Sequence, residues 1–162
     1  MEMMIDCPVC GKTKFHQKCD YEICSYCGWE NGDSDMVYHP NGDLSIADYR
    51  LRYEMYLHAN PEYVWEKHGF PELTAKEKCE YWYQFSMSNK KEIERSEKCG
   101  CFFCIKIFDQ FQISEHYIND KGGQTATCPY CGVDSVLPDS KVRLSVPFLE
   151  EMYKIYFEYD EG

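Results

Sequence analysis

The sequence predicts an α+β protein in which two small cysteine-rich modules flank a helical middle segment. Four Cys-x-x-Cys pairs occur as two sets near opposite ends of the 162-residue chain. Between the sets, capping residues and 3.6-residue patterns of apolar side chains indicate helices, and short alternating segments near the cysteines indicate strands. We therefore expect three parts, which span residues 1–32, 33–98 and 99–162, the last ending in a helix.

The cysteine spacing predicts two metal sites with four thiolates each. Two residues between paired thiols let both sulfurs face one ion, and a second pair completes a tetrahedron around Zn²⁺. The expected ligands are Cys7, Cys10, Cys24 and Cys27 in the first site and Cys101, Cys104, Cys128 and Cys131 in the second. The two modules are accordingly predicted to be of zinc-ribbon or treble-clef type, with two structural zinc ions per chain.

Two other uses of paired cysteines fit the chain less well. Disulfide scaffolds are typical of small secreted domains, and the first residues, MEMMID, lack the basic and apolar regions of a signal peptide. The pair Cys128–Cys131 resembles a redox motif, but the 31 residues after it are too few for a thioredoxin-like fold. Metal binding in a reducing cytoplasm is therefore the preferred interpretation.

Three cysteines remain once eight ligands are assigned. Cys99 is an alternative ligand at the second site, and Cys19 or His16 is an alternative at the first. Cys79 lies within a predicted helix and is expected to be a small buried residue.

Glycine follows the second cysteine in three of the four pairs, at positions 11, 28 and 132. A glycine adopts φ > 0 at little cost, so the backbone amides of such a turn can face the sulfurs. Ile105 occupies this place after Cys104, and we expect that turn to be the least regular of the four.

Capping residues locate the main helices. A capping box of Ser45 and Asp48 predicts a helix to about residue 58, and Thr74 with Glu77 predicts a long helix to about residue 97. Ser145 predicts the start of the C-terminal helix. The first of these helices has two stripes that we expect in the core, an aliphatic one of Leu44, Ala47, Leu51 and Met55 and an aromatic one of Tyr49, Tyr53 and Tyr56.

The acidic charge of the chain indicates which kinds of molecule it is expected to bind. The formal charge of −11 is spread along the chain, with −2 in residues 1–32, −5 in 33–97 and −4 in 98–162. Four thiolates around one Zn²⁺ add further negative charge, and such a surface repels nucleic-acid phosphates and attracts basic proteins. No apolar run approaches the ~20 residues of a membrane span. We therefore expect a cytoplasmic protein that contacts neither nucleic acid nor membrane.

The chain also lacks familiar catalytic motifs. It contains no His-Glu-x-x-His, Gly-x-Ser-x-Gly or phosphate-binding loop, and no histidine is followed two residues later by glutamate, as a zinc deaminase requires. The sequence favours a protein without enzymatic activity.

Two parts of the chain resemble known families. Residues 7 to about 57 resemble the bacterial cysteine-rich CPCC family, through Cys7-Pro8-Val9-Cys10-Gly11, Tyr21-Glu22-Ile23-Cys24, Cys27-Gly28-Trp29-Glu30 and Asn41-Gly42-Asp43-Leu44-Ser45. The chain departs from that pattern in having Cys-Pro-Val-Cys where adjacent cysteines are common, and in its additional Cys19. Residues 101–157 resemble a second family of small bacterial cytoplasmic proteins, through Cys101-Phe102-Phe103-Cys104, Cys128-Pro129-Tyr130-Cys131-Gly132 and the helix around Phe148-Leu149-Glu150-Glu151-Met152.

The first resemblance implies a place in bacterial toxin–immunity loci, as an antidote to a polymorphic toxin. With the acidic charge, it predicts an immunity protein that neutralises a basic toxin domain by direct binding. The carboxylates expected to contact the partner are Glu62, Glu66, Glu72, Glu77 and Glu80. Two alternatives remain, a zinc-ribbon adaptor of the transcription or translation machinery and a zinc enzyme with an unrecognised site.

Overall fold

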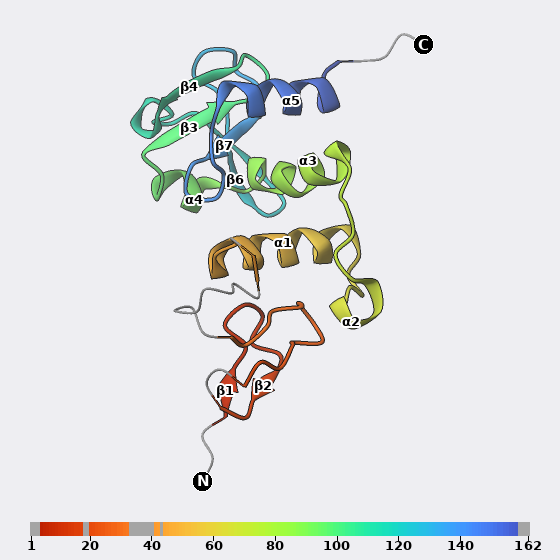
Figure 1. The fold of residues 1–162 in the computed structure, drawn as a ribbon. Coiled ribbons are helices and arrows are strands. Elements are labelled where there is room, and N and C mark those ends of the chain that lie inside the picture. Colours follow the sequence, from red (N-terminus) through yellow and green to blue (C-terminus); the bar gives the residue numbers. More distant parts are fainter. Residues whose placement is uncertain (1–3, 18–19, 33–40, 43, 159–162) are drawn as a thin grey trace. The chain divides into compact units, whose positions relative to one another are not determined.

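A computed structural model describes residues 4–17, 20–32, 41–42 and 44–158 (Figure 1). The chain forms two compact units, residues 1–74 and 75–162, which we call unit 1 and unit 2. Both helices and strands are present, and each unit contains one group of four cysteines, as the predicted mixed fold requires. The boundary at residue 74 differs from the expected three-part division, because the segment 33–98 is shared between the two units.

In the part of unit 1 that the structure describes, a two-stranded hairpin is combined with two helices. The hairpin pairs β1 (Ile5–Asp6) with β2 (Lys14–Phe15) in antiparallel fashion, and the helices are α1 (Ile46–Ala59) and α2 (Trp65–His68). The predicted capping box begins α1: Ser45 Oγ accepts from the Asp48 amide at 3.1 Å, and an Asp48 carboxylate oxygen accepts from the Ser45 amide at 3.1 Å.

The core of unit 1 forms where the tyrosines of α1 pack on the cysteine module. Tyr49, Tyr53 and Tyr56 are buried in one cluster with Phe15 and three of the four cysteines. The aliphatic stripe of α1 does not share this burial, since Leu44 and Ala47 are exposed and Leu51 and Met55 are half-buried. The prediction was therefore right for the aromatic stripe and wrong for the aliphatic one. Large rings with a polar tip can cover the small module while the hydroxyl still finds a partner, as Tyr53 does with Lys12.

Over its described residues, 75–158, unit 2 contains a three-stranded antiparallel sheet, a separate hairpin and three α-helices. The sheet has the order β4-β3-β7, with β3 (Lys98–Cys101) between β4 (Lys106–Asp109) and β7 (Val136–Pro138). The hairpin joins β5 (Tyr117–Asp120) to β6 (Gly123–Ala126), and short 3₁₀ turns occur at Gln84–Ser86 and Gln110–Gln112. The helices are α3 (Ala75–Tyr83), α4 (Lys90–Glu94) and α5 (Val146–Tyr156).

Helices α3 and α5 lie side by side in unit 2 (Figure 1). They share a core cluster with Leu137 of β7, to which α3 contributes Cys79 and α5 contributes Leu149 and Met152. Ser145 caps α5 as predicted, because its hydroxyl oxygen accepts from the Phe148 amide at 3.2 Å. Among the described residues, no helix has both the length and the apolar character needed to cross a bilayer.

The long helix predicted from Thr74 to Glu97 is broken. Helix α3 ends at Tyr83, a 3₁₀ turn follows, and α4 begins at Lys90. The buried side chain of Asn89 lies at this break. Its Nδ2 donates to the carbonyls of Phe85 and Val136, each at 2.9 Å, and its Oδ1 accepts from the Ala126 amide at 3.0 Å. These bonds tie the break to β6 and β7, so tertiary contacts override the local helical pattern.

Replacing Asn89 with alanine is expected to lower the free energy of unfolding by about 2–3 kcal/mol, because buried backbone groups of Val136 and Ala126 would lose their partner. Urea unfolding of the metal-loaded chain, followed by circular dichroism, measures this loss. Asn119→Ala is the matched control, since Asn119 is exposed and accepts a long, 3.4 Å hydrogen bond from Gln124. Equal stability of the two variants would show that Asn89 does not hold the break.

Candidate metal centres

The first group of thiols lies between the β1–β2 hairpin and a second turn. Cys7 and Cys10 lie in the connection from β1 to β2, while Cys24 and Cys27 lie inside the turn closed by the Ile23–Glu30 bridge. The Sγ atoms of Cys7 and Cys27 are 3.6 Å apart, and those of Cys10 and Cys24 are 3.5 Å apart. All four sulfurs lie within 4.8 Å of one another.

The second group has the same construction in unit 2. Cys101 ends β3 and Cys104 precedes β4, while Cys128 and Cys131 lie in the connection from β6 to β7. The Cys101 and Cys131 sulfurs are 3.6 Å apart, those of Cys104 and Cys128 are 3.7 Å apart, and all four again lie within 4.8 Å. The structure thus brings together each set of four cysteines that the spacing predicted.

These sulfur–sulfur distances fit a shared metal ion. A tetrahedron with metal–sulfur bonds of ~2.3 Å has edges of about 3.8 Å, whereas a disulfide bond is ~2.05 Å long. The four sulfur–sulfur distances given above, 3.5–3.7 Å, are close to this tetrahedral edge. The ten cysteines that the structure describes form no disulfide. Both groups are therefore compatible with one metal ion each.

All four Cys-x-x-Cys turns have the same backbone geometry. In each, the amide of the residue after the second cysteine donates to the carbonyl of the first cysteine at 2.8–2.9 Å. That residue has φ of +69° at Gly11, +79° at Gly28 and Gly132, and +62° at Ile105. The prediction that the Ile105 turn is irregular was wrong, since the isoleucine adopts the left-handed conformation that glycine adopts elsewhere.

When no metal is bound, burial opposes simultaneous ionisation of the four thiols in each group. Burial raises the pKa of Cys10 to about 11 and also raises the pKa of Cys101. Hydrogen bonds from the thiols of Cys27 and Cys7 lower the pKa of Cys24. A metal ion requires thiolates, so its binding must displace the protons that the other sulfurs retain.

The two alternative ligands that the structure describes, Cys99 and His16, lie outside the two groups of thiols. Cys99 is completely buried in the core of unit 2, outside the second group of thiols, and burial raises its pKa to about 12. Cys79 is buried between α3 and α5, as predicted for a small core residue. Cys19 falls outside the described residues. His16 belongs to an exposed group with Asp20 and Glu22, where its Nδ1 lies 3.2 Å from a Glu22 oxygen.

The predicted partner-binding carboxylates are divided between the two units. Glu62, Glu66 and Glu72 are exposed in unit 1, whereas α3 of unit 2 carries an exposed Glu80 and a half-buried Glu77.

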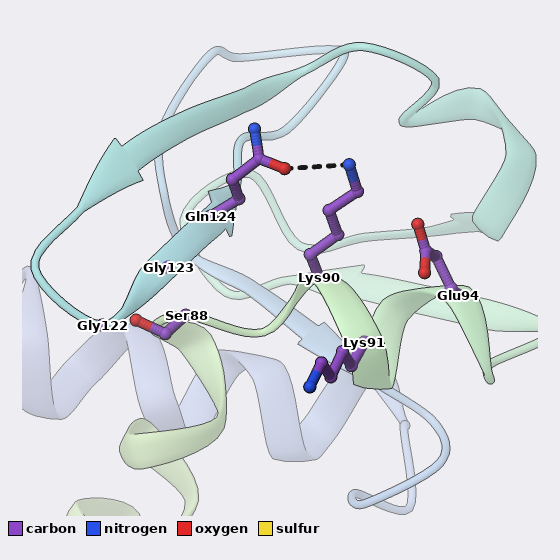
Figure 2. A pocket seen from close by; sticks show the side chains of 7 residues that line it. All are labelled: Ser88, Lys90, Lys91, Glu94, Gly122, Gly123 and Gln124. Atoms are coloured by element: carbon purple, nitrogen blue, oxygen red, sulfur yellow. Dashed lines mark hydrogen bonds between the residues drawn. The ribbon is translucent and has the colours of Figure 1, made fainter.

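Unit 2 also has a cavity of about 700 Å³, shown in Figure 2. Its lining consists of Ser88, Lys90, Lys91, Glu94, Gly122, Gly123 and Gln124. Lys90 Nζ donates to Gln124 Oε1 at 2.8 Å, and Figure 2 shows Lys91 pointing in another direction. Because the two ammonium groups diverge and Glu94 shares the rim, the cavity does not focus positive charge on one ligand.

Comparison with known proteins identifies a relationship for the N-terminal part. Residues 5–67 match the family model described as cysteine-rich CPCC, over a range that contains the first group of thiols and α1. This part of the chain is similar to that family. The relationship of residues 101–157 to a second family stays a prediction. Neither the curated proteins nor the solved structures include a match.

Proposed function

We propose that the protein is a non-enzymatic zinc protein, whose two four-cysteine centres stabilise a surface that binds a basic protein partner. The observation that carries this proposal is the pair of four-thiol groups with sulfur–sulfur distances of 3.5–3.7 Å. Four thiolates occupy every position around a tetrahedral ion, which leaves no position for a catalytic water.

Zinc is the metal that best fits a structural role in these centres. Tetrahedral sites of four thiolates take zinc or iron, and zinc is inert to oxidation and reduction. The first centre joins segments with little regular structure of their own, the two-residue strands β1 and β2 and the turn closed by the Ile23–Glu30 bridge. The binding energy of the metal would then contribute directly to folding.

The surface of α3 and α5 in unit 2 supports binding of a basic protein. Exposed Glu80 and Glu151 lie on these helices, and Tyr83 of α3 stacks on Tyr156 of α5 with ring centroids 4.5 Å apart. Burial raises the pKa of Tyr156 to about 12, and the charge of Glu80 adds to this increase. Carboxylates beside aromatic rings suit a partner that is steered by charge and held by apolar contacts.

The proposed partner is a cognate toxin domain, so that the protein acts as its immunity protein. Residues 5–67 match the cysteine-rich CPCC family model. Resemblance to that family implies a place in toxin–immunity loci, and this implication motivates the proposed partner. The acidic charge of −11 supports a basic domain as the target.

Coexpression with the product of the neighbouring gene is expected to abolish the toxicity of that product and to yield a soluble complex. Because charge steers the encounter, the double variant Glu80→Lys/Glu151→Lys is expected to slow association about tenfold with little change in dissociation. Stopped-flow or surface-plasmon measurements at low and high salt give both rates.

The matched control is Glu94→Lys/Glu115→Lys, which changes the net charge equally at two exposed positions outside α3 and α5. A neighbouring product that is harmless alone, or that remains toxic in the presence of this protein, would contradict the immunity function. Tight, salt-sensitive retention of generic DNA or RNA would instead favour the adaptor function.

A further inference from the structure

Each group of thiols is accompanied by a lysine and a tyrosine in equivalent positions. Lys12 and Lys106 each lie two residues after the second cysteine of the first pair in their group. Tyr26 and Tyr130 each directly precede the last cysteine. The two groups differ in the length between their pairs, with residues 11–23 in one and residues 105–127 in the other, so this agreement is not a consequence of a simple tandem repeat.

The lysine lies over the tyrosine ring in both units. Lys106 Nζ is 4.3 Å from the centroid of the Tyr130 ring. Lys12 Nζ is 5.6 Å from the centroid of the Tyr26 ring and 5.4 Å from that of the Tyr53 ring on α1. These distances fall within the ~6 Å range of an attractive cation–π interaction. Because the lysine follows the first Cys-x-x-Cys pair and the tyrosine lies inside the second, each interaction spans the two halves of a metal centre.

One residue of each pair also donates a backbone hydrogen bond to a sulfur. The Lys12 amide donates to Cys10 Sγ at 3.4 Å, and the Tyr130 amide donates to Cys128 Sγ at 3.4 Å. A rotation of either turn would therefore disturb a bond to sulfur and the cation–π interaction at once.

Each pair is anchored to the rest of its unit. Lys12 Nζ donates to Tyr53 Oη of α1 at 2.9 Å, and Tyr130 Oη donates to Gln112 Oε1 at 2.6 Å. The Tyr130 ring also lies 5.7 Å from the ring of Phe108 on β4, measured between centroids. These contacts restrict where the lysine and tyrosine can move.

We infer that Lys12–Tyr26 and Lys106–Tyr130 are positioning pairs, which hold the two Cys-x-x-Cys turns of each centre together and slow the loss of its metal ion. Four thiolates around Zn²⁺ carry a net charge of −2, so a nearby ammonium group also offsets part of the charge of the centre. This inference rests on the zinc centres of the proposed function, but it concerns how long they retain metal.

The test measures how fast the zinc-loaded full-length protein transfers zinc to a coloured chelator. Lys106→Gln is expected to increase the rate of transfer from the second centre about 2–5-fold, which corresponds to an exposed cation–π interaction. Lys106→Arg keeps the cation over the ring and is expected to stay close to the wild-type rate. Tyr130→Phe keeps the ring but loses the anchoring hydrogen bond to Gln112, so its rate is expected to lie between those of the wild type and Lys106→Gln. Combining Lys106→Gln with Tyr130→Leu is expected to add little to either single change, because both remove the same interaction.

Lys121→Gln is the matched control, because it removes an equal charge from an exposed turn of unit 2. If Lys106→Gln transfers zinc no faster than Lys121→Gln, or if Lys106→Arg is as fast as Lys106→Gln, the positioning role is wrong while the zinc centres stand. If the wild-type protein holds no zinc, the proposed function itself is wrong.

Discussion

Substituting Cys101 with alanine is expected to remove one of the two zinc ions from the chain and to unfold the end of unit 2 that holds it. Cys101 closes β3, and its sulfur lies 3.6 Å from that of Cys131, so its loss leaves three thiolates and an open position. Structural zinc contributes apparent binding energies of about 10–16 kcal/mol in small modules, which is far more than the few contacts of a short strand supply. The effect should therefore exceed that of an ordinary core substitution.

The same strand provides a matched control in Cys99. Cys99 and Cys101 lie two residues apart on β3 with both side chains fully buried, so each alanine variant removes one buried thiol from the same strand. Cys99→Ala is expected to keep both zinc ions and to lose about 1–2 kcal/mol of stability through the small cavity. Elemental analysis gives the metal content, and amide dispersion in a ¹H–¹⁵N spectrum reports the folding of each unit. Two zinc ions in Cys101→Ala, or one in Cys99→Ala, would contradict the assignment.

The features that sequence analysis predicted well are encoded over a few neighbouring residues. A Cys-x-x-Cys spacing constrains both sulfurs through the backbone between them, and both predicted groups form. The capping boundaries at Ser45 and Ser145 are equally local, because each hydroxyl accepts from an amide three residues later. These elements could therefore be predicted without knowledge of the rest of the fold.

The features that it missed depend on partners distant in sequence. The residues from Thr74 to Glu97 have a continuous helical pattern, yet the helix stops at Tyr83, and Asn89 bonds the break to the backbone of β6 and β7. Along α1 both stripes were apolar enough for a core, and the choice of the aromatic one depends on the cysteine module it covers. The local sequence identifies neither the backbone groups that Asn89 binds nor the cysteine module that α1 covers.

Ile105 adopts a left-handed backbone conformation against its local preference. A β-branched residue at φ +62° is disfavoured by about 1–2 kcal/mol, which is why the sequence predicted an irregular turn. The turn nevertheless forms the same hydrogen bond as the other three, from the Ile105 amide to the Cys101 carbonyl at 2.9 Å. The side chain packs against the core shared by α3 and α5, so burial of the isoleucine offsets part of the backbone cost.

At Gly28, unlike at Ile105, the surroundings leave no room for a side chain. Gly28→Ala is therefore expected to lower the free energy of unfolding of unit 1 by about 3 kcal/mol or more. Gly28 has φ +79°, where an alanine costs about 1–2 kcal/mol. A Cβ at this position would also lie 2.5 Å from Cδ1 of Trp65 and 2.7 Å from Cζ of Phe70. Overlap of this kind costs about 1–3 kcal/mol more when the neighbours cannot move away.

Trp65 has little freedom to move, because its backbone is bound to the second turn of the metal centre. The amides of Trp65 and Glu66 donate to the carbonyls of Tyr26 and Ser25, each at 2.9 Å. Relieving the overlap would therefore require breaking bonds that join α2 to the turn carrying Cys27. We expect Gly28→Ala to weaken both this junction and the metal centre beside it.

Gly11→Ala separates the two contributions. Gly11 occupies the equivalent place in the first turn with φ +69°, but no heavy atom of the described residues lies within 4 Å of a Cβ built there. It should therefore show the backbone cost alone, about 1–2 kcal/mol. Urea unfolding of the zinc-loaded proteins, followed by tryptophan fluorescence, compares the two variants. A difference of 1 kcal/mol or more in the expected direction indicates that Trp65 and Phe70 close over Gly28, whereas equal losses would mean that these rings have room to move.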